Sequence, residues 1–356
     1  MDNLPSEIEE LANKAVVGLL PEKSKGIYEK TYANYETWCS QKKVVNIVHE
    51  KVLLAYFKEE SMKKKSSSLW SYYSMLRSTL LIKKNVDISK FNQLIAFLKR
   101  KSDSYTSKKS RILTKENVAK FLQEADNETY LLLKVSMIIG ISGACRRDEL
   151  KNLRIEDVHD EGVVFRIFIP STKTKVPREF FVTPGDVEGI NMVQLVRTYV
   201  AMRPPDAEVS RFLLSFRNNK CTKQPVGIHT FGNMCKTIAA FLKLPHSAEY
   251  TGHCFRRSSA SLLADSGVDL HTIKRHGGWK SDTVAEGYIE NSCENKKIIS
   301  AAILGKKSSS SVSSTVVPSE ETETIQIKNH NNATISTPMS NINLTNCNNV
   351  TFNFNH

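Results

Sequence analysis

Apolar residues recur at helical spacing through the first 100 residues of the chain. Within each stretch they lie three or four positions apart, which is typical of an amphipathic helix packed on a core. Four such stretches are separated by short polar connectors: Ser24–Gln41, Val44–Glu59, Ser66–Leu81 and Ile88–Leu98. The pattern predicts a helical bundle over residues 1–100.

The pattern changes twice further along the chain. Residues 101–112 are polar and basic without hydrophobic periodicity, so they are predicted to be an interdomain linker. Two alternating stretches, Gly162–Pro170 and Glu179–Thr183, predict a β-hairpin whose turn carries lysines. Thr114 is expected to cap the first of a series of helices. These helices are predicted at Lys115–Ala125, Tyr130–Ile141, Ile190–Met202, His229–Leu244, Phe255–Asp265, Asp269–His276, Ser281–Tyr288 and Asn295–Leu304.

The predicted fold class is therefore mainly α with one small antiparallel β-sheet. A helical domain (1–100) and the linker (101–112) precede an α+β domain (113–307). Residues 308–356 are rich in Ser, Thr and Asn, and most of this low-complexity tail is expected to be disordered. Its end, 342–354, alternates like a strand, which raises the hypothesis that it pairs with another chain.

The charge of the chain points to a polyanionic partner. The formal net charge is +13 and the sequence pI is about 9.3. Because the tail carries one Lys against three Glu (net −2), the first 307 residues carry +15. Nucleic acid is the favoured partner, although membrane-surface proteins show similar surpluses.

Other classes are disfavoured. The chain has no apolar run long enough to span a bilayer, and its start does not resemble a signal peptide. Seven scattered cysteines without a Cys-x-x-Cys pair favour reduced thiols over disulfides or zinc. We therefore expect a protein that is not secreted, nuclear if the host is a eukaryote and otherwise cytoplasmic. A zinc site at His253, His271 and His276 is set aside because no cysteine accompanies them.

Two basic clusters are candidate DNA contacts. The first leads into the aromatic-rich helix predicted from Ser66, and the second lies in the linker. Basic side chains at a helix start or in a linker hold phosphates well, but solvated basic turns have the same composition. The candidates in these clusters are Lys63, Lys64, Lys65, Lys108, Lys109 and Arg111, and Lys175 on the predicted hairpin turn is a further candidate DNA contact.

Between residues 146 and 288 lie side chains that together suit cleavage of a phosphodiester. Fixed cations must neutralise the non-bridging oxygens, and arginine matches their geometry. The spacing Arg-x-x-Glu selects Arg146, which lies one helical turn from Glu149, and we place Arg146 at the end of an apolar helix. The spacing His-x-x-Arg selects Arg256, on the same helical face as His253. A plain ion pair of Arg146 with Glu149 is the alternative interpretation.

Three further residues complete the set. Lys173, on the predicted hairpin turn, is a candidate acid for the leaving oxygen, with Lys175 as its rival. Trp279 offers an indole N–H donor, although core packing is the commoner role of Trp. Tyr288 is the candidate nucleophile because it follows Trp279 by nine residues on a short predicted helix.

These motifs resemble the catalytic domain of the tyrosine recombinases, the phage integrase family. The family signature is Arg-x-x-Glu-Leu, a hairpin Lys, His-x-x-Arg, a His or Trp, and the Tyr nucleophile. It is matched in order by Arg146, Lys173, His253, Arg256, Trp279 and Tyr288. The stretch 276–289, with Trp in place of His, is Cre-like and also similar to Crypton-type eukaryotic elements and host genes derived from them. The Asn-rich tail has no counterpart in the family pattern.

The resemblance implies a SAM-like core-binding domain before the catalytic domain and double-stranded DNA as partner. It implies cleavage through a 3′-phosphotyrosine without cofactor or metal, by protomers that form dimers and tetramers on DNA. The helix after Tyr288 would dock on a neighbouring protomer. Two alternatives stay open: a domesticated DNA-binding or scaffold protein that keeps the fold without strand exchange, and a type IB topoisomerase.

Overall fold

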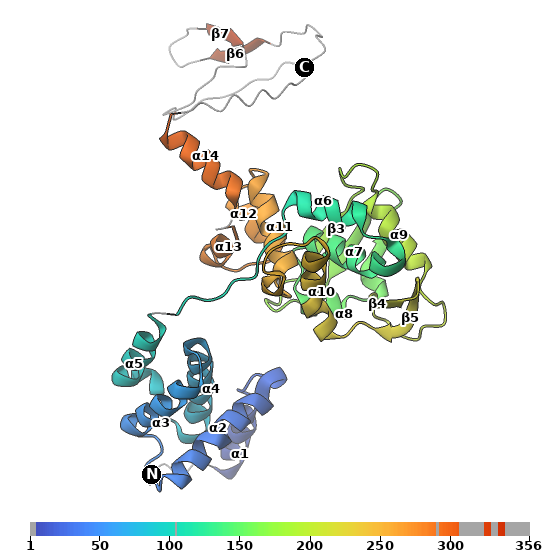
Figure 1. The fold of residues 1–356 in the computed structure, drawn as a ribbon. Coiled ribbons are helices and arrows are strands. Elements are labelled where there is room, and N and C mark those ends of the chain that lie inside the picture. Colours follow the sequence, from blue (N-terminus) through green and yellow to red (C-terminus); the bar gives the residue numbers. More distant parts are fainter. Residues whose placement is uncertain (1–4, 104, 290–291, 306–323, 329–333, 339–356) are drawn as a thin grey trace.

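The computed structural model describes residues 5–103, 105–289, 292–305, 324–328 and 334–338. Figure 1 shows two helical bodies joined by an extended segment. We call them the N-terminal bundle (α1 to α5) and the C-terminal body (α6 to α14). Within the described residues no helix is both long and apolar enough to cross a membrane.

The N-terminal bundle consists of five helices and two short 3₁₀ turns. The helices are α1 (Ser6–Val17), α2 (Lys25–Gln41), α3 (Glu50–Lys63), α4 (Ser66–Lys84) and α5 (Asn92–Ser102), and the turns are η1 (Glu22–Ser24) and η2 (Ile88–Lys90). Helices α2 to α5 enclose an aromatic-rich core around Tyr35, Phe57 and Leu76. Burying such side chains stabilises the bundle by roughly 1.5–3 kcal/mol each.

The bundle differs from the sequence prediction at α1 and at the start of α3. Helix α1 was not predicted. Helix α3 begins at Glu50 and not at Val44, because His49 is its N-cap and the His49 ring accepts the Lys51 N–H at 3.2 Å. The sequence left open whether the aromatic stripe of α4 enters a DNA groove or packs in the core. Leu69 and Tyr73 are buried, so the structure favours core packing for this stripe.

The extended segment is tied to the C-terminal body at its end. Residues 105–113 form no helix or strand. The Arg111 guanidinium binds the Glu249 carboxylate at 2.8 Å, and the Leu113 N–H donates to the Ser258 hydroxyl at 2.8 Å. The segment therefore reaches helix α6 along the surface of the body.

The C-terminal body is mainly helical. Its helices are α6 (Lys115–Glu124), α7 (Asn127–Ser142), α8 (Arg147–Asn152), α9 (Met192–Ala201), α10 (Ile228–Phe241), α11 (Cys254–Asp265), α12 (Leu270–Gly277), α13 (Asp282–Ile289) and α14 (Cys293–Ile303), with 3₁₀ turns η3 (Ile155–Asp157) and η4 (Ser247–Glu249). Thr114 caps α6 as predicted, because its hydroxyl accepts the Asn117 N–H. Helix α7 lies at the centre, with Leu131, Val135 and Ile139 fully buried.

The body contains two small antiparallel sheets where the sequence predicted one. The first has the order β1 (Val158–Asp160), β2 (Phe165–Ile169), β3 (Arg178–Val182), and its β2–β3 hairpin was predicted. The second, β4 (Leu214–Arg217) and β5 (Lys220–Pro225), was not predicted, because β5 is polar along most of its length and lacks alternation.

A separate apolar cluster holds the last helices of the body. Ala260, Ile273, Trp279 and Ala285 come together there, and Tyr288 packs against them. Helix α14 leads away from the body and exposes Ile299 and Ile303. In the tail the structure describes two paired strands, β6 (Thr324–Lys328) and β7 (Thr334–Pro338), which were not predicted. The strand expected at 342–354 lies outside the described residues.

Candidate active site

The sequence predicted that Arg146 lies at the end of an apolar helix. In the structure it lies at the start of a helix instead. Helix α7 ends at Ser142, the chain turns through Ala144 (φ 46°), and Arg146 is the N-cap residue of α8. The Glu149 carboxylate accepts the Arg146 backbone N–H at 2.9 Å and its guanidinium Nη1–H at 2.6 Å. Glu149 thereby fixes both the backbone and the side chain of Arg146.

A second arginine shares that carboxylate. Arg178, the first residue of β3, donates from Nη2 to Glu149 at 2.6 Å. Its Nη1 donates to the carbonyl oxygens of Gly143 at 2.6 Å and His276 at 2.9 Å. Because Arg178 and Glu149 are both buried, this ion pair connects β3, α8 and the end of α12 in a region of low dielectric.

Arg256 is the most deeply buried charged residue of the site, with no exposed surface. It lies in the first turn of α11 and donates to the carbonyl oxygens of Ala144 and Gly277, both at 2.7 Å. Burial, together with repulsion from Arg146, lowers the pKa of Arg256 to about 10, so it stays charged at neutral pH. The two backbone bonds hold the guanidinium plane in one orientation.

Two glycines make this packing possible. A Cβ on Gly277 would lie 2.0 Å from the ring of Trp279, and one on Gly278 would lie 2.7 Å from Cδ of Arg178. Gly278 also has φ 63°, which favours glycine, and it ends α12. The Gly-Gly turn therefore lets Trp279 and Arg178 approach the backbone closely.

Trp279 and Tyr288 form one face of the site. Their ring centroids are 4.7 Å apart, and the Arg256 guanidinium lies 4.3 Å from the Trp279 centroid and 5.5 Å from that of Tyr288. Trp279 is 6% exposed, and its indole N–H has no hydrogen-bond partner within the described part of the chain. The predicted donor is thus buried, and its ring also packs in the core.

Several positively charged side chains lie close enough to His253 to affect its protonation. The pKa of His253 is lowered, first by desolvation and then by the nearby charges of Arg256, Arg147, Arg146 and Lys173. The imidazole is consequently neutral at pH 7 and can accept a proton.

The two candidate lysines occupy different places on the β2–β3 turn. Both are exposed, but Lys173 is among the cations that lower the pKa of His253. Lys175 occupies a left-handed position with φ 58°. The Thr174 hydroxyl donates to the Gly278 carbonyl at 3.3 Å, which ties the turn to the residue before Trp279.

The candidate DNA-contacting residues fall into two groups. Lys63, Lys65 and Lys108 are exposed on the surface. Lys64 pairs with Glu60 and lies 4.7 Å from the Tyr72 ring centroid, and Arg111 pairs with Glu249. These intramolecular pairs compete with a phosphate for Lys64 and Arg111. Lys109 is exposed and also makes an intramolecular interaction.

Sequence reasoning missed two arginines of the site. Arg178 occupies an inward position of β3, in line with the buried Phe180 and Val182, and a charge at such a position requires a partner. That signal was available in the alternation of the strand. Arg257, the neighbour of Arg256, does not fit the His-x-x-Arg spacing, yet it lies 5.7 Å from the Tyr288 centroid and donates to the Gly287 carbonyl at 3.4 Å.

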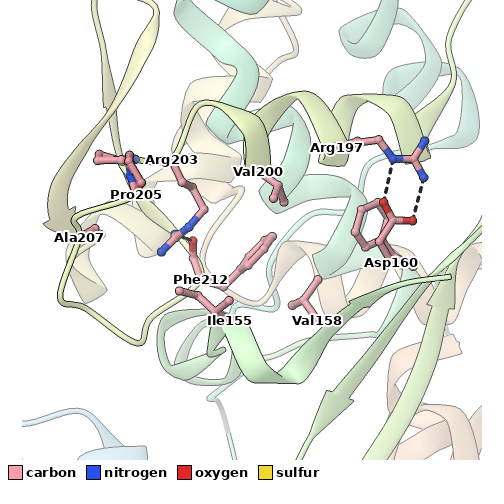
Figure 2. A pocket seen from close by; sticks show the side chains of 11 residues that line it. Ile155, Val158, Asp160, Arg197, Val200, Arg203, Pro205, Ala207 and Phe212 are labelled. Carbon is pink, nitrogen blue, oxygen red and sulfur yellow. Dashed lines mark hydrogen bonds and ion pairs between the residues drawn. The ribbon is translucent and has the colours of Figure 1, made fainter. Parts of the chain in front are cut away.

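A hollow elsewhere in the C-terminal body contains none of these residues. It is lined by Ile155, Val200 and Phe212, and its volume is about 330 Å³ (Figure 2). Arg197 at its rim is held by Asp160 at 2.7 Å, and Arg203 by the Phe212 carbonyl. Both guanidinium groups already have partners, so the hollow offers no chemistry that competes with the site around Arg256.

No group of three or more His, Cys, Asp or Glu side chains in the described residues could hold a metal ion. The polar atoms of the site belong to arginines, the Glu149 carboxylate, Lys173, His253, the Trp279 indole and the Tyr288 phenol.

Comparison with known proteins identifies the family. The model of the phage integrase family matches residues 111–295, which is more than half of the chain. The chain belongs to this family. A comparison with curated proteins found no match.

Solved structures share the fold. The Tn1549 transposon integrase in complex with transposon right end DNA is 16% identical, with a TM-score of 0.56 over 81% of this chain and 95% of that one. A lambda integrase dimer bound to a COC′ core site is 15% identical, with a TM-score of 0.50 over 79% of this chain and 75% of that one. The fold is that of the tyrosine recombinases.

Proposed function

We propose that this chain is a site-specific DNA recombinase that cuts and rejoins duplex DNA through a covalent bond to Tyr288. The observation that carries the proposal is the position of Arg256, fixed by two backbone carbonyls beside the rings of Trp279 and Tyr288. Family membership supports it. Nuclear location in a eukaryotic host, a Crypton-type origin and assembly into dimers and tetramers on DNA belong to the same proposal.

The proposed reaction begins with the phosphate bound between Arg146 and Arg256. Their charges neutralise the non-bridging oxygens, which allows an oxygen nucleophile to approach. Glu149 and Arg178 hold Arg146 in place through the buried ion pair. No metal is required in this scheme, because the arginines supply the positive charge.

The Tyr288 phenol oxygen then attacks phosphorus, and the bond from phosphorus to the 5′-oxygen breaks. Neutral His253 accepts the phenol proton, and Lys173 donates a proton to the departing 5′-oxygen. The products are a 3′-phosphotyrosine and a free 5′-hydroxyl. Attack by the 5′-hydroxyl of another strand reverses the step and completes strand transfer, so no bond energy is lost.

A suicide substrate tests this proposal, because a nick near the scissile phosphate lets the short 5′-hydroxyl fragment diffuse away and traps the covalent complex. We expect a denaturation-resistant adduct between the DNA and the wild-type chain, and none with Tyr288→Phe. Tyr250→Phe, a buried tyrosine outside the constellation, is the control and should keep the adduct. An adduct that persists in Tyr288→Phe would contradict the assignment of the nucleophile.

The Asn-rich tail, which has no counterpart in the family pattern, favours a second candidate function, a DNA-binding or scaffold protein without strand exchange. Arg256 donates hydrogen bonds to the carbonyl oxygens of Ala144 and Gly277, so a protein that keeps the fold without catalysis would also need this residue. If the wild type binds its target DNA but forms no adduct on it, and Tyr288→Phe leaves DNA binding unchanged, the second candidate replaces the first.

A further inference from the structure

One face of helix α11 carries three polar side chains that hold the segment around Tyr288. Arg257, Ser261 and Asp265 follow one another at intervals of four residues, so they stand in a row along one side of the helix. Helix α13 packs against α11 (Figure 1). Each of the three side chains bonds to a different point of residues 287–292, and we call them the α11 row.

The first two residues of the row bind the end of helix α13. The Arg257 guanidinium donates from Nη1 to the Gly287 carbonyl at 3.4 Å. The Ser261 hydroxyl donates to the carbonyl of Tyr288 itself at 3.5 Å. The last four carbonyls of a helix have no partner within it, and a cation at this end also suits the helix dipole. The row therefore caps α13 at the residue that carries the phenol.

The third residue of the row fixes the chain just after α13. The Ser292 hydroxyl donates to the Asp265 carboxylate at 2.6 Å, and Ser292 is buried. The Ser292 backbone N–H donates to the Ile289 carbonyl at 2.8 Å, which closes the chain after α13 into a turn. The backbone of Tyr288 thus lies between bonded points on both sides.

The same helix positions the phosphate-binding arginine. Arg256 directly precedes Arg257 in α11, and their guanidinium groups lie 5.5 Å and 5.7 Å from the Tyr288 ring centroid. An oxygen nucleophile reacts only from about 3–3.5 Å and in line with the bond that breaks. Because α11 carries both Arg256 and the row, it determines how the phenol lies relative to the bound phosphate.

We propose that Arg257 and Ser261 are positioning residues, which place the Tyr288 phenol oxygen in line with the phosphate that Arg256 binds. They act through the end of α13 and not by touching the phosphate. Asp265 assists by fixing the turn that follows. The inference rests on the proposed function for the reaction that it serves, and on the contacts of the row for the position of the ring.

Single-turnover cleavage of a suicide substrate at saturating full-length chain separates positioning from DNA binding. Arg257→Met should slow cleavage roughly 100-fold, because a displacement of about 1 Å costs that much rate. The dissociation constant for the DNA should stay unchanged. Arg257→Lys, which keeps a cationic donor for the Gly287 carbonyl, should recover most of the rate. Ser261→Ala, a milder change that guards against poor folding of the arginine variant, should slow cleavage about tenfold.

A changed leaving group distinguishes this role from that of the acid. A substrate with sulfur in place of the bridging 5′-oxygen expels a thiolate, which needs no proton donor. The defect of Arg257→Met should be as large on this substrate as on normal DNA, because Arg257 acts on the nucleophile. Full recovery on the sulfur substrate would contradict the proposal.

The position of the Tyr288 ring can also be measured without DNA. The 11 tyrosines are replaced by 3-fluorotyrosine, and the resonance of Tyr288 is the one missing from Tyr288→Phe. The Trp279 ring lies 4.7 Å away and shifts this fluorine resonance through its ring current, so a displaced Tyr288 ring gives a different signal. Arg257→Met should change the signal, and Arg257→Lys should restore it.

Arg203→Met is the matched control. Arg203 also donates to a backbone carbonyl, that of Phe212, and lies 5.9 Å from the centroid of its ring, but it lines the hollow away from the site. It should keep the wild-type rate and fluorine signal, and an equal loss of rate in Arg203→Met would overturn the proposal.

Wild-type cleavage by folded Arg257→Met and Ser261→Ala would also overturn the proposal, as would an unchanged fluorine signal in both. If the wild type forms no adduct, the recombinase assignment fails. The fluorine signal alone then decides whether the row holds Tyr288, so the two failures are distinguishable.

Discussion

Glu149 Oε2 accepts a hydrogen bond from Arg178 Nη2 at 2.6 Å, and both side chains are buried. The same carboxylate holds Arg146 through Oε1. One buried carboxylate therefore determines where the candidate phosphate-binding arginine lies. Because Arg178 also donates to the His276 carbonyl, this arrangement reaches the turn that carries Trp279.

Replacing Arg178 should damage both stability and cleavage. Arg178→Met leaves the Glu149 charge buried with one partner fewer and removes the donor of two carbonyls, which costs about 3–5 kcal/mol of unfolding free energy. Urea unfolding measures this loss. The control is Arg166→Met on the adjacent strand, whose exposed pairs with Glu161 and Glu179 contribute less than about 1 kcal/mol.

A specific effect on the site can be separated from the loss of stability. Replacing one non-bridging oxygen of the scissile phosphate by a methyl group removes the charge that Arg146 neutralises. We expect this methylphosphonate to offset most of the cleavage defect of Arg178→Met, because a misplaced Arg146 then matters less. An equal defect on both substrates would show that Arg178 has a purely structural role.

Much of the site could be predicted from sequence because its residues stand at fixed spacings within single elements. Arg146 with Glu149, and His253 with Arg256, are one helical turn apart, and Trp279 lies in the short turn before α13, which carries Tyr288. The alternation of β3 marks Arg178 as a buried charge, but it does not identify the partners of Arg178, which are 29 to 98 residues away in the sequence. Such contacts depend on tertiary packing, which spacing does not encode.

The fold likewise contains helices that the sequence predicted and a helix boundary that it did not. The bounds of α2 and α11 were predicted to within a residue. The start of α3 was not, because residues 44–49 continue the apolar spacing but form a connecting segment in which the Ile47 carbonyl accepts the Tyr35 hydroxyl at 2.5 Å. Periodicity identifies a buried face and does not by itself locate the first helical turn.

Trp279→Phe should separate stability from function. The indole N–H is buried without a partner in the described residues, and such a group costs about 1–3 kcal/mol. Phe keeps a ring beside Arg256 and removes this cost, but its smaller ring also loses buried contacts. Because the two effects oppose each other, the free energy of unfolding should change by less than about 1 kcal/mol. If the N–H donates to the phosphate during the reaction, single-turnover cleavage should fall roughly hundredfold.

The matched control is Trp70→Phe in the N-terminal bundle. Its indole N–H donates to the Ser102 hydroxyl at 2.8 Å, so the same substitution there removes a satisfied bond. It should destabilise the chain by about 1 kcal/mol and leave the rate of the cleavage step unchanged. Wild-type cleavage by Trp279→Phe would assign Trp279 to core packing alone.

A substrate whose leaving group needs no proton can show whether Lys173 or Lys175 is the catalytic acid. A substrate with sulfur in place of the bridging 5′-oxygen expels a thiolate, which needs no proton donor. Lys173→Ala should slow cleavage of normal DNA by roughly 100- to 10,000-fold and be close to wild type on the sulfur substrate. Lys175→Ala, on the same turn, should show no such difference between substrates. The reverse result would move the acid to Lys175.

His276 should make the stability of the chain depend on pH. Burial, with Arg178 and Arg256 nearby, lowers the pKa of His276 to about 4, whereas an unfolded histidine has a pKa of about 6.5. The unfolded chain therefore binds a proton between these values while the folded chain does not, so stability falls as the pH drops below about 6.5. The loss attributable to His276 at pH 5, relative to pH 7.5, is about 2 kcal/mol.

In His276→Gln, whose amide can still bond the Ser259 hydroxyl, urea unfolding at the two pH values should lack this component. Equal pH dependence in the variant and the wild type would show that His276 does not resist protonation in the folded state.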